Sequence, residues 1–200
     1  MELERQTLEA AFAAVGRDKL AWEFLPAPVT LERLEDALRH LHILHLVCHG
    51  AFNAKQGQAA LYLQDASGKA HRVLDEQLAG LLAHQGVQPR LVFLSACQSA
   101  TRSQADAFLG LAPKLVSIGV PAVVAMQDAV TITSAREFSA RFYKRLLEHG
   151  QVDLAMNEAR STLLTARRPD AAAPVLFMRL KSGRLWAEED LSDTTNLPES

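Results

Sequence analysis

Two reactive side chains each follow an apolar run of strand length. His49 comes directly after "HILHLVC" (42–48), and Cys97 comes directly after "LVFLSA" (91–96). A thiolate is an effective nucleophile in acyl transfer, and a nearby imidazole both favours the thiolate and protonates a leaving amine. The two residues therefore predict attack of Cys97 on a carbonyl carbon, with His49 as general base and acid.

The elements around these residues alternate between strands and helices, which predicts a mainly parallel sheet with helices on both faces. His49 and Cys97 are 48 residues apart, enough for a hairpin, one helix and the return to a neighbouring parallel strand. Ligands bind at the carboxyl ends of such strands, so both side chains are expected to face one crevice. We predict strands at 20–26, 42–50, 91–96, 122–127 and 174–180, a hairpin over 59–74 turning at Ser67-Gly68, and helices at 1–15, 30–41, 75–84, 107–119, 133–149 and 153–167.

Backbone amides and polar side chains near the same strand ends complete the expected site. Gly50 and Cys97 are the expected oxyanion donors, because residues at the end of a strand have amides that the sheet no longer uses. Gln98, Gln127 and Asp128 are the expected substrate-binding residues, although strand ends also favour polar residues for structural reasons. The loop 98–107 is either mobile until activation or an ordinary surface loop.

Other polar residues have structural interpretations. Alternation along the strand points Cys48 away from His49, so Cys48 is expected in the core. His45 lies deep in the apolar run and is expected to be a core histidine rather than a second base. Asp65 and Asp106 are interpreted as turn and helix-cap residues.

Composition limits the classes of function. The chain has 200 residues, 48% of them hydrophobic and 22% charged, which is typical of one folded domain. Its formal net charge of -2 provides no basic field for nucleic acid or a membrane surface. The absence of an apolar leader or span predicts a cytoplasmic protein. Two cysteines are too few for a disulfide framework or a thiolate-only zinc site, and no metal or cofactor is expected.

The order and spacing of several segments resemble the CHAT family of caspase-like cysteine peptidases from about residue 20 to residue 186. The segments are "HILHLVCHGAF", "LVFLSACQSA", "LGLAPKLVSIGVPAVVAMQ", "FYKRLLEHGQVDLAMNEARSTL" and "APVLFMRLKSGRLW". This resemblance implies a cysteine endopeptidase of the caspase and separase type, with His49 and Cys97 as its catalytic dyad and no metal.

The resemblance also implies an architecture and partners. The expected fold is a three-layer caspase-like α/β domain over 1–186, with a mainly parallel sheet, a small hairpin after the histidine strand and a disordered acidic tail at 187–200. A protein substrate is expected, together with a regulatory protein or a fused sensor or repeat domain, in bacterial defence or signalling. A homo-oligomer paired through the edge of the last strand is expected by analogy.

Two other classes of function stay open at this point. The first is an interaction module that keeps the caspase-like fold with an idle dyad, although retention of both His49 and Cys97 argues against it. The second is another acyl chemistry, such as amidotransfer from glutamine. Its usual chain order places cysteine before histidine, so the order here disfavours it.

Overall fold

The structure of the chain is a computed structural model that describes residues 2–15, 21–96, 102–128 and 130–186. Its elements are α1 (Glu2–Val15), α2 (Leu31–Leu38), β1 (Ile43–Asn53), β2 (Gln58–Gln64), β3 (Ala70–Leu74), α3 (Asp75–Ala83), β4 (Leu91–Ala96), α4 (Arg102–Ser117), β5 (Ala122–Met126), α5 (Ile132–His149), α6 (Val152–Thr165) and β6 (Pro174–Met178). Most of them match the predicted elements to within a few residues. The predicted tail at 187–200 lies outside the described residues.

The described strands form one mixed sheet in the order β3-β2-β1-β4-β5-β6. Only β1 with β4 and β4 with β5 pair in parallel, while the other three pairs are antiparallel. The expectation of a mainly parallel sheet is therefore right for the centre and wrong for the whole. After β4, the single helix α4 carries the chain back to the end of the sheet where β4 began, so β5 runs parallel to β4. After β5, the two helices α5 and α6 together bring the chain back to the end where β5 finished, so β6 runs antiparallel to β5.

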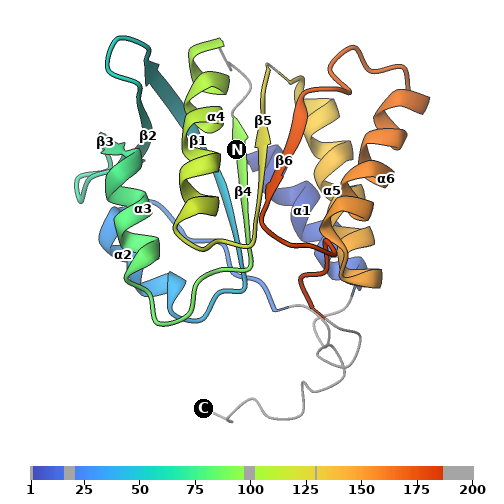
Figure 1. Cartoon of the computed structure of the whole chain (residues 1–200), viewed down its shortest axis with the longest axis horizontal. Helices are drawn as coiled ribbons and strands as arrows, with labels where there is room; N and C mark the ends of the chain where they lie inside the picture. The colour runs from blue at the N-terminus through green and yellow to red at the C-terminus, as the bar shows by residue number, and fades with distance from the viewer. Residues whose placement is uncertain (1, 16–20, 97–101, 129, 187–200) are drawn as a thin grey trace.

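Helices cover both faces of this sheet (Figure 1). α2, α3 and α4 pack on one face, and α1, α5 and α6 pack on the other. Side chains of the central strand β4 alternate between the two cores. Leu94 packs on the α4 side of the sheet, and Phe93 packs on the α5 side. The strands that carry the candidate site are thus held from both faces.

Two helix ends are formed by local interactions. The hydroxyl of Thr30 caps α2 by accepting a hydrogen bond from the Arg33 backbone N–H at 3.2 Å, and Leu34 and Leu38 are buried on its inner face. α5 ends at Gly150, whose φ of 70° is the left-handed conformation that glycine adopts at low cost.

The predicted hairpin turn is also confirmed. Gly68 has a φ of 81°, and the Asp65 carboxylate accepts hydrogen bonds from the Ser67 hydroxyl and backbone N–H and from the Lys69 backbone N–H. The hydrogen bond from the Ser67 hydroxyl is the main cause that holds the pKa of Asp65 below its ordinary value. Asp65 is therefore a turn residue.

Two predicted segments are wrong. Residues 21–26 form no strand; they run in coil, where Trp22 packs on Phe12 of α1 and the Arg33 guanidinium donates to the Pro26 carbonyl at 2.8 Å. These apolar residues anchor a connection instead of joining the sheet.

The second error is the extent of the loop 98–107. α4 begins at Arg102, so Asp106 lies inside the helix rather than at its cap. Residues 102–107 contain no glycine or proline and continue the helical pattern that buries Ala107 and Phe108.

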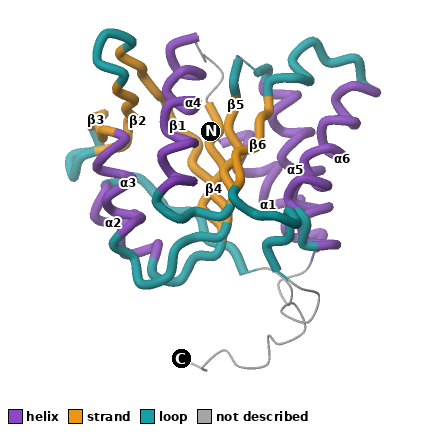
Figure 2. The backbone as a smooth tube through the Cα atoms, in the orientation of Figure 1, coloured by secondary structure: helices purple, strands orange, loops and turns teal. Residues whose placement is uncertain are grey.

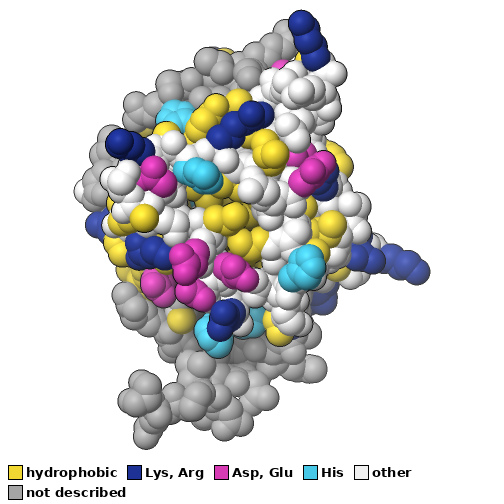
Figure 3. Space-filling model, turned by 90° about the vertical axis from the view of Figure 1, so that its left-hand side faces the viewer, with side chains coloured by type: hydrophobic (Ala, Val, Ile, Leu, Met, Phe, Trp, Pro, Cys, Tyr) yellow, Lys and Arg dark blue, Asp and Glu magenta, His cyan; other side chains and the backbone are white. Residues whose placement is uncertain are grey.

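The molecular surface over β3, α2 and α3 mixes acidic, basic and apolar side chains, as Figure 3 shows. Neither sign of charge dominates this face, in agreement with the small net charge. Within the described ranges no helix is both long and apolar enough to cross a membrane.

Candidate functional site

The carboxyl ends of β1, β4 and β5 lie toward one edge of the sheet, where β1 continues into its hairpin with β2 (Figure 2). The last parallel pair of β1 and β4 joins Cys48 to Ala96. His49, the next residue of β1, is the first residue to pair with β2, where it stands opposite Tyr62. The histidine therefore lies where the parallel part of the sheet ends.

Alternation along β1 separates the histidine from the neighbouring thiol. Cys48 is 7% exposed and packs in the core beneath α4, whereas His49 is exposed. The prediction that Cys48 is a core residue on the opposite face is confirmed. The imidazole of His49 is thus accessible to a substrate at the sheet edge.

His45 lies on the same face of β1 as His49 but in the interior. Its Nδ1 lies 2.9 Å from the hydroxyl of Tyr143, and its ring stacks on Phe93 with the centroids 4.4 Å apart. These contacts confirm that His45 is a hydrogen-bonded core histidine. Four residues at about 3.3 Å each separate it from His49, so it is out of reach of a substrate at the edge.

Gly50 was expected to end the strand, but it does not. β1 continues to Asn53, and Gly50 pairs with Leu61 of β2. The strand continues because the hairpin to β2 supplies a new hydrogen-bonding partner beyond the parallel region. On the opposite side of β1, the described part of β4 ends at Ala96, so the prediction that Gly50 donates to an oxyanion stays open.

The predicted nucleophile Cys97 and its neighbour Gln98 lie outside the described residues. The chain geometry up to them is described: Cys97 is bonded to Ala96, the last residue of β4 and the partner of Cys48. The roles of Cys97 and Gln98 stay predictions.

Gln127 and Asp128 follow β5 at the same edge, two strands from β1. Both are exposed. The Gln127 backbone N–H donates to the Ala173 carbonyl at 2.8 Å, and its side-chain Nε2 donates to the Ala172 carbonyl at 2.7 Å. Gln127 thus ties the 172–173 segment to the end of β5, and its substrate role stays a prediction alongside this structural one.

Asp170 fixes the loop between α6 and β6 to the start of α5. Its carboxylate accepts hydrogen bonds from the Thr131 backbone N–H at 2.6 Å and from the Ser134 hydroxyl. Burial raises the pKa of the Asp170 carboxyl, but the hydrogen bonds from Ser134 and Thr131 outweigh that effect and hold the pKa below its ordinary value. The negative charge also faces the positive end of the α5 dipole.

We expect Asp170→Asn to lower the free energy of unfolding at pH 7 by about 1 kcal/mol, because the amide cannot carry the charge that these donors stabilise. A lowered native pKa contributes stability above the unfolded value, near 3.9, and that contribution is lost as the pH falls through the native pKa. Urea unfolding from pH 7 to pH 3 should therefore show the two proteins converging in acid. The control is Asp36→Asn, which removes an exposed carboxylate. If the free energy of unfolding of Asp170→Asn differs from that of the unchanged chain by the same amount at every pH, the role assigned to the Asp170 charge is contradicted.

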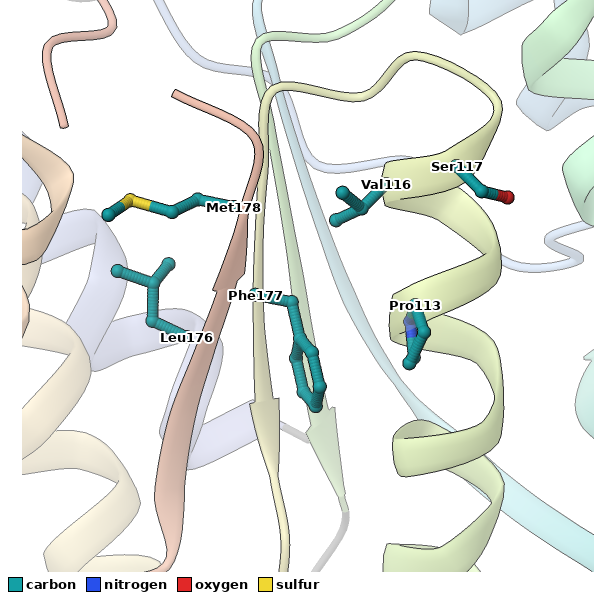
Figure 4. Close-up of a pocket in the computed structure, with 6 residues that line it drawn as sticks. All are labelled: Pro113, Val116, Ser117, Leu176, Phe177 and Met178. Atoms are coloured by element: carbon teal, nitrogen blue, oxygen red, sulfur yellow. The ribbon is translucent and has the colours of Figure 1, made fainter. Parts of the chain in front are cut away.

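A separate groove of about 420 Å³ lies between α4 and β6, away from this edge (Figure 4). Phe177 points toward α4, whereas Leu176 and Met178 point to the other side of β6. Its lining has no titratable side chain and consists of Pro113, Val116, Ser117, Leu176, Phe177 and Met178. This groove therefore offers no acid, base or nucleophile.

The described part of the chain offers no binding site for a metal ion. In that part, no three or more His, Cys, Asp or Glu side chains come together in an arrangement that could hold a metal ion. At the carboxyl ends of the parallel strands, the described side chains that could take part in a reaction are the imidazole of His49 and the polar groups of Gln127 and Asp128.

An α/β domain with a six-stranded mixed sheet and an accessible histidine at its carboxyl edge is consistent with the class of caspase-like folds. The chain belongs to the CHAT-domain family, because the family model of the CHAT domain matches residues 2–192. This family is related to the caspase-like cysteine peptidases. The match includes α1, which precedes the region that carries the resemblance in the sequence. No curated protein matches the chain.

Two exposed residues beside the histidine were not predicted from the sequence. Tyr62 pairs with His49, and Arg72 of β3 pairs with Tyr62. The alternation of "LYLQ" and "HRVL" indicates which side chains share a face, but only the strand register shows that this row ends at His49.

Proposed function

We propose that this protein is a cysteine endopeptidase with a three-layer caspase-like fold, in which Cys97 is the nucleophile and His49 the general base and acid. The CHAT-domain membership supports the reaction class. The proposal depends most on one observation: the parallel register of β1 and β4 reaches Cys48 and Ala96, so the residues that follow them are His49 and Cys97. Adjacent strands lie about 4.8 Å apart, which brings groups at their ends within reach of one substrate carbonyl.

The proposed reaction needs no group beyond these residues and water. The Cys97 thiolate attacks the scissile carbonyl carbon, and the carbonyl oxygen becomes an oxyanion held by the N–H groups of Gly50 and Cys97. The C–N bond then breaks as His49 gives its proton to the leaving amine, which produces a thioester. His49 next takes a proton from water, and the resulting hydroxide attacks the thioester carbonyl. The C–S bond then breaks, which releases the carboxylic acid and restores the Cys97 thiolate beside protonated His49.

Substrate binding and regulation follow from the same proposal. Gln98, Gln127 and Asp128 would contact the acyl half of a protein substrate, because β5 lies on the far side of β4 from His49. An endopeptidase in the cytoplasm requires restraint, so we propose control by a regulatory protein or by a fused sensor or repeat domain. Constitutive full activity of the isolated chain would contradict this regulation.

Cleavage of an unbiased peptide library tests the peptidase activity. The library is incubated with the chain and with Cys97→Ala, with and without lysate of the source cells, and the products are read by mass spectrometry. We expect cuts that require Cys97 and fall by at least about 10³-fold in Cys97→Ala. A thiol-reactive peptide should label the chain at Cys97 alone.

Cys48→Ala is the matched control for the thiol. Cys48 is buried on the opposite face of the sheet, so this variant should keep both cleavage and labelling. Loss of labelling in Cys48→Ala but not in Cys97→Ala would refute the assignment of the nucleophile. Silence in every condition, together with a probe that ignores Cys97, would favour the idle interaction module.

Pairing of two copies through the last strand stays a proposal by analogy. β6 is an edge of the described sheet, and the Arg160 guanidinium donates to the Pro174 carbonyl at 2.7 Å. Arg160 therefore closes one end of this edge, while Leu176 and Met178 follow along the strand. Sedimentation of the chain over a range of concentrations measures whether it dimerises.

A further inference from the structure

Three exposed side chains form a row across the hairpin end of the sheet. His49 pairs with Tyr62, and Tyr62 pairs with Arg72, so the three residues occupy successive strands β1, β2 and β3. Directly opposed residues on antiparallel strands point to the same face. The neighbouring positions Leu61 and Val73 are buried on the other face, in the core beneath α4.

Among the residues that the structure describes, no side-chain hydrogen bond or ion pair accounts for the positions of Tyr62 and Arg72. Tyr62 is 39% exposed, which is high for an aromatic residue in the middle of a strand. Arg72 is exposed and forms no ion pair with any residue that the structure describes. An exposed aromatic ring and a guanidinium without a carboxylate partner are typical of a surface that binds a ligand.

The role of His49 indicates which half of the substrate lies over Tyr62 and Arg72, so this step rests on the proposed function. The group that protonates the leaving amine lies beside the leaving half of the substrate. His49 is on β1, and β2 and β3 lie on the side of β1 away from β4. The leaving half is therefore expected over Tyr62 and Arg72, and the acyl half over the end of β5.

We propose that Tyr62 and Arg72 form the binding surface for the substrate segment that follows the scissile bond, and that Arg72 selects an acidic residue in that segment. Two strand spacings of about 4.8 Å separate β1 from β3, and an extended peptide advances about 3.3 Å per residue. Arg72 thus meets the second or third residue after the scissile bond. The Tyr62 ring contacts the substrate residue that precedes the one bound by Arg72.

Arginine suits this role because its planar guanidinium binds a carboxylate through two parallel hydrogen bonds. Because the pair is solvent-exposed, the expected preference is modest: about fivefold for Glu over Gln at that position. Arg72→Gln should abolish the preference, and Arg72→Glu should turn it into a preference for Lys. Arg72→Lys should retain a weaker preference, since it keeps the charge but not the paired geometry.

The test uses cleavage and binding in parallel. The cleavage library is read for its residues after each cut with the chain and its Arg72 variants. A peptide array that varies Glu, Gln and Lys at each position is probed for binding with Cys97→Ala, alone and combined with Arg72→Gln. Lys69→Gln is the matched control, because Lys69 is an exposed cation in the turn of the same hairpin.

The two proposals fail in different ways. A Glu preference that disappears in Arg72→Gln and persists in Lys69→Gln supports the inference, even if it appears in binding without cleavage, which would refute only the peptidase. Cleavage without any such preference, or an equal loss in Lys69→Gln, overturns the inference and leaves the peptidase intact. No binding and no cleavage overturns both. Tyr62→Ala should weaken binding of Glu and Gln peptides alike; unchanged binding would remove Tyr62 from the surface.

Discussion

His49→Ala is expected to lower kcat/KM for peptide cleavage by about 10²–10⁴-fold, the usual contribution of a general acid and base. The side chain is exposed at the sheet edge, so the free energy of unfolding should change by no more than about 0.5 kcal/mol. Initial rates on the best peptide of the library, together with urea unfolding of the same preparation, measure both quantities. A large loss of rate without a loss of stability identifies a chemical role.

The other histidine of the same strand face provides the control. In the double variant His45→Phe with Tyr143→Phe, both partners of the 2.9 Å hydrogen bond are replaced by rings of similar shape. Replacing both partners removes both ends of this hydrogen bond and is expected to cost less stability than replacing one of them. This variant should keep its activity. If its rate falls as much as that of His49→Ala, the loss in His49→Ala cannot be assigned to general acid and base catalysis by His49.

Phe93→Ala is expected to lower the free energy of unfolding by about 3–5 kcal/mol. Phe93 is 0% exposed on the central strand β4, and its ring contacts those of His45, Phe138, Phe142 and Tyr143. Removing the ring leaves a cavity between the sheet and α5. A domain is typically stable by only 5–15 kcal/mol, so a large part of its stability would be lost. Urea unfolding at constant pH measures the change.

Phe93→Leu separates the cavity from the chemistry of the ring. Leucine fills more of the space than alanine, so we expect it to cost about half as much or less. The folded fraction of either variant should still cleave peptides, because Phe93 lies inside the strand and does not reach its end. A cost below about 1 kcal/mol for Phe93→Ala would show that this core is much looser than its contacts indicate.

Much of the fold follows from local patterns. The Ser67-Gly68 turn forms as predicted, and the Thr30 cap and the Gly150 end of α5 are equally local, because each depends on a hydrogen bond or a backbone conformation within a few residues. The opposite burial of Cys48 and His49 also follows from the period of the strand. Such features need no knowledge of distant contacts.

The errors come from features that depend on distant segments. The run 21–26 has strand-like composition, but whether a segment joins a sheet depends on an open strand edge beside it, and here it packs on α1 instead. Gly50 was expected to end β1, yet β2 extends the strand by pairing with it. The antiparallel return of β6 likewise depends on how the helix pair α5–α6 crosses the sheet.

The sequence alone was enough to identify the family and the candidate dyad, because the motifs around His49 and Cys97 have a specific order and spacing along the chain. It also determined the faces of the strands, since side chains alternate with a period of two. Which strands are neighbours, and in which register they pair, could be seen only in the folded molecule. That register aligns His49 with Tyr62 and Arg72 across three strands, and it results from the packing of the whole sheet rather than from any local pattern.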